Sequence, residues 1–179
     1  LGLVACAADD GAVDSSTDNL TAGVEIGVIS DLDDTVVPPS EPEGSEPPYP
    51  GVATLYQILE TRRSGQPGDV YYVTARTPER VVDVPPWLEA HGVPTGNIDT
   101  GTSGNPFVAR PEKIRDTEAI LARTGTQKFV LFGDTKHVDP EVQQAILAAH
   151  PDRILATIMH KVTNTVAPHR VEGLSLVEN

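Results

Sequence analysis

A set of polar residues in this 179-residue sequence could act together on a phosphate group. The set comprises Asp31, Asp33 and Thr35 in the segment DLDDT, Thr74, Lys113, and Asp134 and Asp139 in the segment GDTKHVD. Carboxylates that gather at one place repel one another unless a divalent cation binds between them, and ligands that are all oxygen suit Mg²⁺. The residue types therefore predict a Mg²⁺ site accompanied by a hydroxyl and an ammonium group.

Asp31 and Asp33 are separated by one residue, which allows two roles at a phosphate ester. One carboxylate would attack phosphorus as a nucleophile and form an acyl phosphate. The other would protonate the leaving oxygen and later take a proton from water. Mg²⁺, Lys113 and the Thr74 hydroxyl would neutralise the charge on the phosphoryl oxygens. The pair thus predicts a phosphomonoester hydrolase.

Apolar runs predict the buried strands that must bring these residues together. The runs are Val24–Ser30, Val70–Thr74, Lys128–Phe132 and Ile154–Met159. Helical patterns alternate with them, with apolar residues on one face over 52–59, 87–91, 114–121 and 142–149. This alternation predicts an α/β fold with a parallel sheet that helices cover on both faces. The polar residues would then meet at the carboxyl ends of the strands.

The order and context of Asp31–Thr35, Thr74, Lys113 and Asp134 resemble the four motifs of the haloacid dehalogenase superfamily. The resemblance implies a three-layer, Rossmann-like core, dependence on Mg²⁺ and an aspartyl-phosphate intermediate. It also implies that Thr74 and Lys113 bind the phosphoryl oxygens.

The same resemblance assigns the carboxylates. Asp31 would be the nucleophile, and Asp33 would be the general acid and base. Asp31, the backbone carbonyl of Asp33 and Asp134 would hold Mg²⁺, with Asp139 adjacent.

Residues 26–162 resemble more closely the catalytic domain of actin-patch-associated phosphatidate phosphatases, on segments such as VISDLDDT, WLEAHGVPTGNI and FVLFGDTKHVDPE. The resemblance implies hydrolysis of phosphatidate to diacylglycerol. The segment TARTPER stands where that family has a serine-rich motif, and Lys136 and His137 also depart from its pattern. We therefore expect a phospholipid such as phosphatidate as the substrate, with Thr35 and Arg76 as substrate contacts and Arg76 facing a second anionic group.

The spacing between the motifs leaves no room for a large cap domain over the site. The proline-rich segment 38–50 and one helix fill the interval between Asp31 and Thr74, and residues 93–112 are too few for an inserted domain. An uncovered site suits a bulky substrate such as a lipid headgroup at a membrane, because small metabolites usually need a lid that excludes water.

Composition excludes several other classes of protein. The chain has 13 basic and 26 acidic residues and a formal net charge of −13, which argues against nucleic acid as a partner. The single cysteine excludes an internal disulfide framework and a zinc site with several cysteines.

That cysteine, Cys6, follows an apolar start, LGLVAC, which resembles the end of a bacterial lipoprotein signal. We expect Cys6 to be lipidated and to anchor the protein at the cell envelope, facing the periplasm or the surface. The expected organisation is a signal remnant with an acidic tether over 1–23, a phosphatase domain over 24–168 and a C-terminal tail over 169–179.

Some residues keep a second interpretation. Asp139 precedes a proline and could cap the next helix as well as serve the site. Lys136 competes with Lys113 as the phosphate-binding lysine, and His137 could help a leaving group or be an ordinary loop histidine.

Two other functions remain compatible with the sequence. A phospho-accepting receiver module also places an acidic pocket, a threonine and a lysine on a parallel sheet. An inactive surface lipoprotein could use the carboxylates only to bind a cation or a partner.

Overall fold

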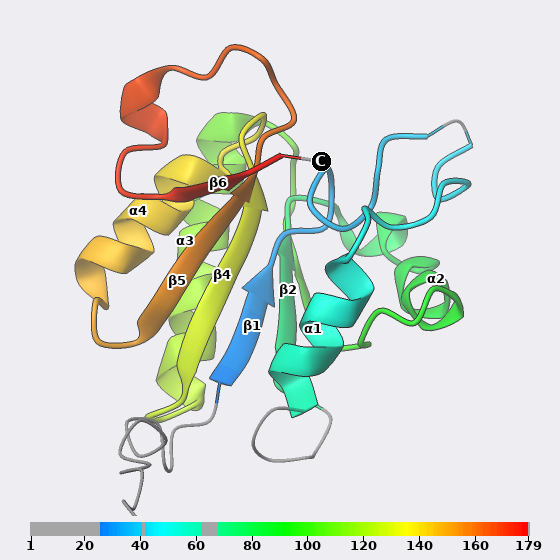
Figure 1. The fold of residues 1–179 in the computed structure, drawn as a ribbon, viewed down its shortest axis with the longest axis horizontal. Coiled ribbons are helices and arrows are strands. Elements are labelled where there is room, and N and C mark those ends of the chain that lie inside the picture. Colours follow the sequence, from blue (N-terminus) through cyan, green and yellow to red (C-terminus); the bar gives the residue numbers. More distant parts are fainter. Residues whose placement is uncertain (1–25, 41, 62–67, 179) are drawn as a thin grey trace, which may run out of the picture.

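The computed structural model describes residues 26–40, 42–61 and 68–178. The strands are β1 (Ile26–Ser30), β2 (Val70–Thr74), β3 (Asn97–Thr100), β4 (Lys128–Asp134), β5 (Ile154–His160) and β6 (Ser175–Val177). The helices are α1 (Val52–Thr61), α2 (Val84–Ala90), α3 (Pro106–Arg123) and α4 (Asp139–Ala149), with two short 3₁₀ helices, η1 (Pro78–Arg80) and η2 (Pro168–Arg170). The strands form one six-stranded parallel sheet in the order β3-β2-β1-β4-β5-β6 (Figure 1).

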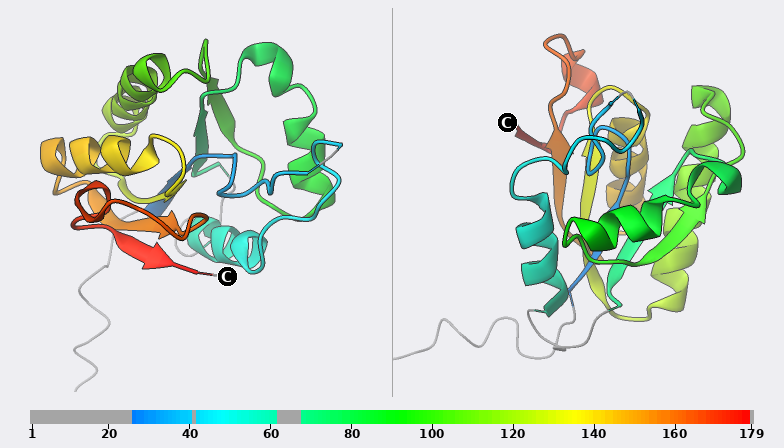
Figure 2. Two further views of the ribbon diagram at one scale, coloured as in Figure 1. Left: turned by 90° about the horizontal axis from the view of Figure 1, so that it is seen from above. Right: turned by 90° about the vertical axis from the view of Figure 1, so that its right-hand side faces the viewer.

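Helices cover both faces of this sheet (Figure 2). Val28 and Ile29 are neighbours in β1, so their side chains point to opposite faces. Val28 belongs to a buried core that includes Tyr56 of α1 and Leu88 of α2. Ile29 belongs to a second core that includes Ile120 of α3 and residues of α4. The predicted α/β fold, with a parallel sheet between two helical layers, is therefore confirmed.

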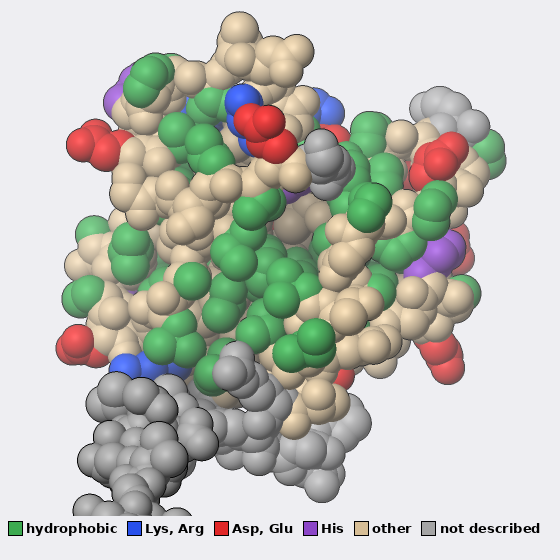
Figure 3. Space-filling view, viewed as in Figure 1, with side chains coloured by type: hydrophobic (Ala, Val, Ile, Leu, Met, Phe, Trp, Pro, Cys, Tyr) green, Lys and Arg blue, Asp and Glu red, His purple; other side chains and the backbone are tan. Residues whose placement is uncertain are grey.

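Hydrophobic side chains gather on the face of the molecule that carries α1, over the sheet beside that helix (Figure 3). Among the described residues, no helix is long and apolar enough to span a bilayer.

β1 ends at Ser30, directly before the first acidic motif. The helix that carries Lys113, α3, begins seven residues before that lysine, at Pro106. The N-cap of α3 is Asn105, whose side chain accepts a hydrogen bond from Phe107 N at 3.0 Å. Pro106 follows at the first helical position, where a proline costs no hydrogen bond. Lys113 therefore lies in the middle turns of a long helix whose start is capped by Asn105.

Two strands were not expected from the sequence. β3 and β6 lie at opposite edges of the sheet and are short. β6 falls within the segment 169–179, which the sequence analysis treated as a tail, and it pairs with β5 through Ile158, Met159 and His160. The predicted lipidated Cys6 and the acidic tether lie outside the described residues.

Candidate active site

An open cleft of about 1100 Å³ lies at the carboxyl ends of the strands. Segments that follow β1, β2 and β4 form its wall together with the first turns of α3 and with η2. Its lining includes Asp31, Asp33, Arg76, Lys113, Lys136 and His137. Since every strand of the sheet is parallel, motifs that are far apart in the sequence meet at this one edge.

The centre of the site is Asp31, which is bound to Lys113. The Lys113 ammonium donates to Asp31 Oδ1 at 2.6 Å and to Asp139 Oδ1 at 2.7 Å, and all three side chains are buried. The capping interpretation of Asp139 is wrong, because Val138 is the N-cap of α4 and no side-chain capping hydrogen bond forms there. Lys113 thus bridges two carboxylates that would otherwise face each other unpaired.

One ammonium group does not compensate the whole acidic cluster. Burial raises the pKa of Asp31 to about 6, although Lys113 acts in the opposite direction. Burial, reinforced by the nearby Asp31, raises the pKa of Asp139 well above its usual value. Burial would lower the pKa of Lys113, but Asp139 and Asp31 outweigh it, so that the lysine stays charged. The site therefore has a deficit of positive charge.

Asp134 ends β4 and is fully buried. Its Oδ1 accepts hydrogen bonds from the backbone N–H groups of Lys136 at 2.6 Å and of His137 at 2.9 Å, and its Oδ2 lies 2.9 Å from His137 Nδ1. Burial would raise the pKa of Asp134, but the hydrogen bonds from His137 prevail and hold it at about 2. Asp134 is therefore ionised, and its orientation is set by the loop that follows it.

Gly133 lets Asp139 approach this strand closely. A Cβ atom at Gly133 would lie 2.6 Å from the Cβ of Asp139, which is closer than such atoms approach in proteins. Only glycine at this position allows the start of α4 to pack against the end of β4 as it does here.

The acidic cluster has the composition of a divalent metal site. Asp31, Asp134, His137 and Asp139 each offer one ligand atom, and these atoms lie within 4.8 Å of one another. Asp31 Oδ2 and Asp139 Oδ2 are buried without a hydrogen-bond partner. Buried carboxylate oxygens that lack partners are costly, and a cation between them would remove that cost. The predicted ligands Asp31 and Asp134 and the adjacent Asp139 thus lie together, and His137 joins them.

Asp33 takes a different direction from Asp31. Its carboxylate is held by Arg76, with Nε at 3.1 and 3.0 Å from the two oxygens and Nη2 at 2.5 Å from Oδ1. On its other side Arg76 pairs with Glu43, at 2.7 Å from Nη1. Arg76, expected to contact substrate, is here bound to the proposed acid and base.

Thr35 and Thr74 are buried, and neither is among the described residues that line the cleft. Thr74 Oγ1 accepts a hydrogen bond from the backbone N–H of Arg76 at 3.1 Å, whereas Thr35 Oγ1 is buried with no hydrogen-bond partner. The structure therefore places both hydroxyls behind the cleft surface, where Thr74 supports the turn that carries Arg76.

Lys136 and Asp34 form a second ion pair at the mouth of the site. Lys136 Nζ lies 2.7 Å from Asp34 Oδ2, and Asp34 has a φ of 58°, a left-handed conformation that aspartate tolerates better than most residues. Burial differs between the two lysines, since the Lys136 side chain is half exposed and Lys113 is buried. Of the two candidates, Lys113 is the one that reaches Asp31.

Sequence reasoning missed Glu43, Asp34 and Arg170, which also line the cleft. Glu43 lies in a loop and Arg170 in the short 3₁₀ helix η2. Neither segment has a periodic pattern, and the partners of both residues are far away in the chain. Asp34 is part of the segment DLDDT, and its acidic neighbours there were the only signal that could have singled it out.

A comparison with known protein families matches residues 26–161 to the phosphatidate phosphatase APP1 catalytic domain. Searches among curated proteins and among solved structures found no match. The matched residues include β1 to β5 and every residue of the acidic cluster. The chain therefore belongs to the family of the phosphatidate phosphatase APP1 catalytic domain.

Proposed function

We propose that the protein is a Mg²⁺-dependent phosphomonoester hydrolase of the haloacid dehalogenase type, which acts through an aspartyl-phosphate on a phospholipid such as phosphatidate. The observation that carries this proposal is the state of Asp31. One oxygen of this buried carboxylate is held by Lys113, the other has no partner, and the residue lines an open cleft. Such a carboxylate is held in one orientation at the wall of the cleft.

In the first step, a carboxylate oxygen of Asp31 attacks phosphorus. A bond forms between this oxygen and phosphorus, and the bond between phosphorus and the ester oxygen breaks. Asp33, in its protonated form, gives its proton to the departing alkoxide, which leaves as the free hydroxyl of diacylglycerol. Lys113 stays beside the phosphorylated residue, where its ammonium group offsets the charge on the transferred group.

In the second step, water attacks the phosphorus of the aspartyl-phosphate. Asp33, now a carboxylate, takes one proton from this water, so that the nucleophile is a developing hydroxide. The bond between Asp31 and phosphorus breaks, inorganic phosphate leaves, and Asp31 returns to its carboxylate form. Asp31 thus ends the cycle as a carboxylate and Asp33 as a carboxylic acid, as they began it.

The residues present fit a divalent cation. Asp31, Asp134 and the backbone carbonyl of Asp33 would hold it, with Asp139 and His137 beside it, and the two buried oxygens without partners lie in the same cluster. A bound Mg²⁺ would supply positive charge to the phosphoryl oxygens. Hydrogen bonds from the loop keep Asp134 ionised and ready for this role.

The open cleft supports a lipid substrate. A volume of about 1100 Å³ without a covering domain among the described residues leaves room for the glycerol and the start of the acyl chains beyond the phosphate. The family match supports the same substrate class.

The test is release of inorganic phosphate from phosphatidate in detergent micelles and from a water-soluble aryl phosphate, with Mg²⁺ and with EDTA. We expect hydrolysis of both substrates only with Mg²⁺, and none with Asp31→Asn. Asp152→Asn changes an exposed aspartate before β5 and is the matched control. Hydrolysis that persists in Asp31→Asn would end the proposal.

A trapping experiment addresses the intermediate. With an aryl phosphate whose phenolate leaves without an acid, Asp33→Asn should accumulate phosphate on Asp31, because the water of the second step has lost its base. Mass spectrometry of the peptide that contains Asp31 detects the phosphate. A phosphorylated Asp31 that persists in the wild-type protein after treatment with acetyl phosphate would favour the receiver module instead.

A further inference from the structure

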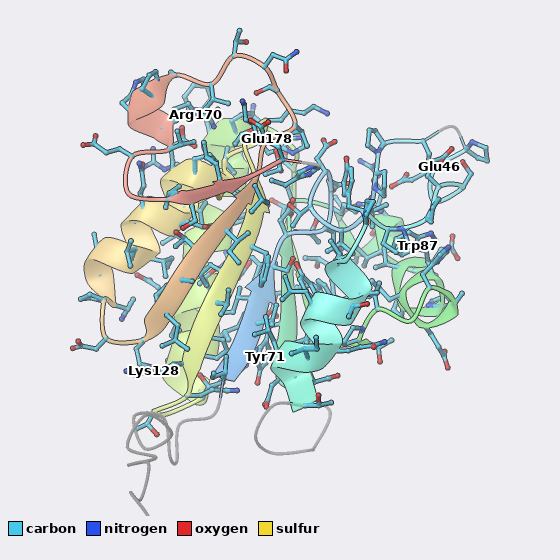
Figure 4. All side chains as sticks on the ribbon, viewed as in Figure 1. Glu46, Tyr71, Trp87, Lys128, Arg170 and Glu178 are labelled. Carbon is cyan, nitrogen blue, oxygen red and sulfur yellow. The ribbon has the colours of Figure 1, made fainter. Side chains whose placement is uncertain are left out.

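A segment that follows the family-matched residues reaches back to the site. Residues 162–178 contain η2 and β6, whereas the match ends at 161. Arg170 of η2 lies beside the start of α4 and lines the cleft (Figure 4). None of the roles assigned above uses Arg170.

Arg170 binds the loop between β4 and α4 with most of its donors. Its Nη1 donates to the carbonyl oxygen of Thr135 at 3.1 Å, and its Nη2 donates to that of His137 at 2.5 Å. Its Nε and Nη2 also pair with the two carboxylate oxygens of Glu141, at 2.5 and 2.9 Å. Glu141 lies in the first turn of α4, so one guanidinium joins the loop to the helix after it.

The loop carbonyl bound by Arg170 belongs to a peptide unit that also binds Asp134. The Thr135 C=O and the Lys136 N–H are two ends of the same planar unit. Arg170 holds its oxygen, and Asp134 Oδ1 accepts from its N–H at 2.6 Å. A positive group on the carbonyl polarises the unit and strengthens the hydrogen bond at the other end.

The second carbonyl fixes the other side of the same turn. His137 donates through its backbone N–H and its ring to Asp134, while its own carbonyl is held by Arg170. Both residues that orient Asp134 are therefore restrained by one side chain from outside the loop.

We propose that Arg170 is a positioning residue that fixes the Asp134 carboxylate, and His137 beside it, for the metal site of the proposed reaction. The proposal rests on the proposed function, because it assigns the geometry of Asp134 a purpose in cation binding. Among the described residues, the hydrogen bonds of Arg170 go to the loop after β4 and to Glu141, so it reaches Asp134 through the loop. Partners that orient metal ligands in this way typically change metal affinity by about 10- to 100-fold when they are removed.

The segment has other attachments, so Arg170 can be changed without detaching it. Gln144 of α4 donates to the carbonyls of His169 and Glu172, both at 3.1 Å. β6 also pairs with β5. We therefore expect Arg170→Gln and Arg170→Lys to keep the fold.

Arg153 offers a matched control. It also clamps a loop, through Nε to the Gln127 carbonyl at 2.7 Å and Nη1 to the Leu121 carbonyl at 3.0 Å. This clamp lies next to Lys128, at the opposite end of the sheet from Arg170 (Figure 4). Arg153→Gln removes a comparable guanidinium far from the cleft.

The experiment has two measurements on the full chain. The first is amide hydrogen exchange of the metal-free protein by NMR. Arg170→Gln should speed exchange at Lys136 and His137 by about tenfold or more, since exchange follows local opening. Arg170→Lys, which keeps a cation, should give a smaller increase, and Arg153→Gln should leave both amides within about twofold.

The second measurement is calorimetric titration with Mg²⁺. We expect Arg170→Gln to weaken the apparent affinity by about tenfold or more, and Arg153→Gln to leave it unchanged. A folded Arg170→Gln with normal exchange at Lys136 and His137 would overturn the proposal. Faster exchange with an unchanged Mg²⁺ affinity would overturn it too, because the loop would then not set Asp134 for the cation. If the wild-type protein binds no Mg²⁺, the proposed dependence on Mg²⁺ is wrong, and the role assigned to Arg170 is wrong with it. Faster exchange in Arg170→Gln would then show only that Arg170 stabilises the loop.

Discussion

Arg76 donates hydrogen bonds to both carboxylate oxygens of Asp33. Its Nε lies 3.1 Å from Oδ1 and 3.0 Å from Oδ2, and its Nη2 lies 2.5 Å from Oδ1. A guanidinium that contacts a carboxylate through two nitrogens fixes its orientation as well as its position. Glu43 holds the same guanidinium from its other side, at 2.7 Å. The proposed general acid and base is thus restrained by a residue that the sequence assigned to substrate binding.

Arg76→Lys separates these two roles. A lysine keeps the positive charge but lacks the paired N–H donors of the guanidinium, so Asp33 would no longer be held in one orientation. We expect kcat on a soluble aryl phosphate to fall by about tenfold to a hundredfold, because small errors in the placement of a reacting group cost that much. The KM of this substrate should stay within about twofold, because the substitution removes no contact that binds the substrate in its ground state. Steady-state kinetics with Mg²⁺ measure both values.

Arg123→Lys is the control for that variant. Arg123 of α3 also pairs with an aspartate, Asp99 of β3, at 3.3 Å, but neither residue lines the cleft. It should leave both constants unchanged. An unchanged kcat, with a higher KM for substrates that carry a second anionic group, would instead support direct substrate binding by Arg76.

Lys113→Met tests the bridge between the buried carboxylates. Removal of the ammonium leaves Asp31 and Asp139 uncompensated, and breaking a buried pair in this way costs about 3–5 kcal/mol. We expect that loss of unfolding free energy at pH 8 in metal-free buffer, measured by urea denaturation. The loss should shrink at pH 5, because Lys113 lowers the pKa of Asp31, so that without the lysine this carboxyl takes up a proton more readily and no longer needs a partner.

Lys136→Met is the companion variant, since Lys136 is half exposed and pairs with Asp34 at 2.7 Å. Exposed pairs contribute about 0.2–1 kcal/mol, so this variant should stay close to the wild type. Equal stability of Lys113→Met and the wild type at pH 8 would contradict the bridging role.

The strands that carry the site could be predicted because their signal is local. β2 has the predicted bounds, Val70–Thr74, since a run of buried apolar residues marks a central parallel strand. β3 and β6 gave no such signal because they are short edge strands whose pairing is set by β2 and β5. Their residues are mostly half-buried or exposed, which removes the apolar run on which the prediction depends.

The approach of Asp31 to Asp134 was predictable from topology, because parallel strands deliver their following residues to one edge. The direction of the Asp33 side chain was not. It depends on Arg76, and Arg76 in turn on Glu43 in the proline-rich segment, where no periodic pattern fixes the backbone. The hold of Arg170 on the loop after β4 is likewise a tertiary contact without a sequence signature.

Gly133→Ala tests the close packing of β4 and α4. The added methyl group would lie 2.6 Å from the Cβ of Asp139, so α4 must shift or the core must absorb strain of about 1–3 kcal/mol. We expect this loss of unfolding free energy together with weaker Mg²⁺ binding, because Asp139 moves away from Asp31. Urea denaturation and calorimetric titration measure the two effects.

Gly104→Ala is the control, because a Cβ atom there meets nothing within 4 Å. It should change stability by no more than about 0.5 kcal/mol. A Gly133→Ala protein as stable as this control would show that α4 tolerates the shift.

The raised pKa of Asp31 makes the metal-free protein sensitive to pH. In the unfolded chain this carboxyl titrates near 3.8, whereas burial keeps it protonated in the folded protein up to about 6. Between these values the folded state binds more protons, so its stability falls as pH rises. Asp134 has the opposite effect, but its pKa of about 2 confines that effect to lower pH.

We therefore expect the melting temperature of the wild-type protein in EDTA to fall between pH 4 and pH 6 relative to that of Asp31→Asn, which lacks this proton. Mg²⁺ should reverse the fall, because a cation binds the ionised carboxylates and releases their protons. The stabilisation by Mg²⁺ should then be larger at pH 7 than at pH 5, as thermal melts at a fixed Mg²⁺ concentration would show. An equal gain at both pH values would mean that Mg²⁺ does not bind at Asp31, because a site that includes this carboxyl, with its pKa of about 6, must lose affinity between pH 7 and pH 5.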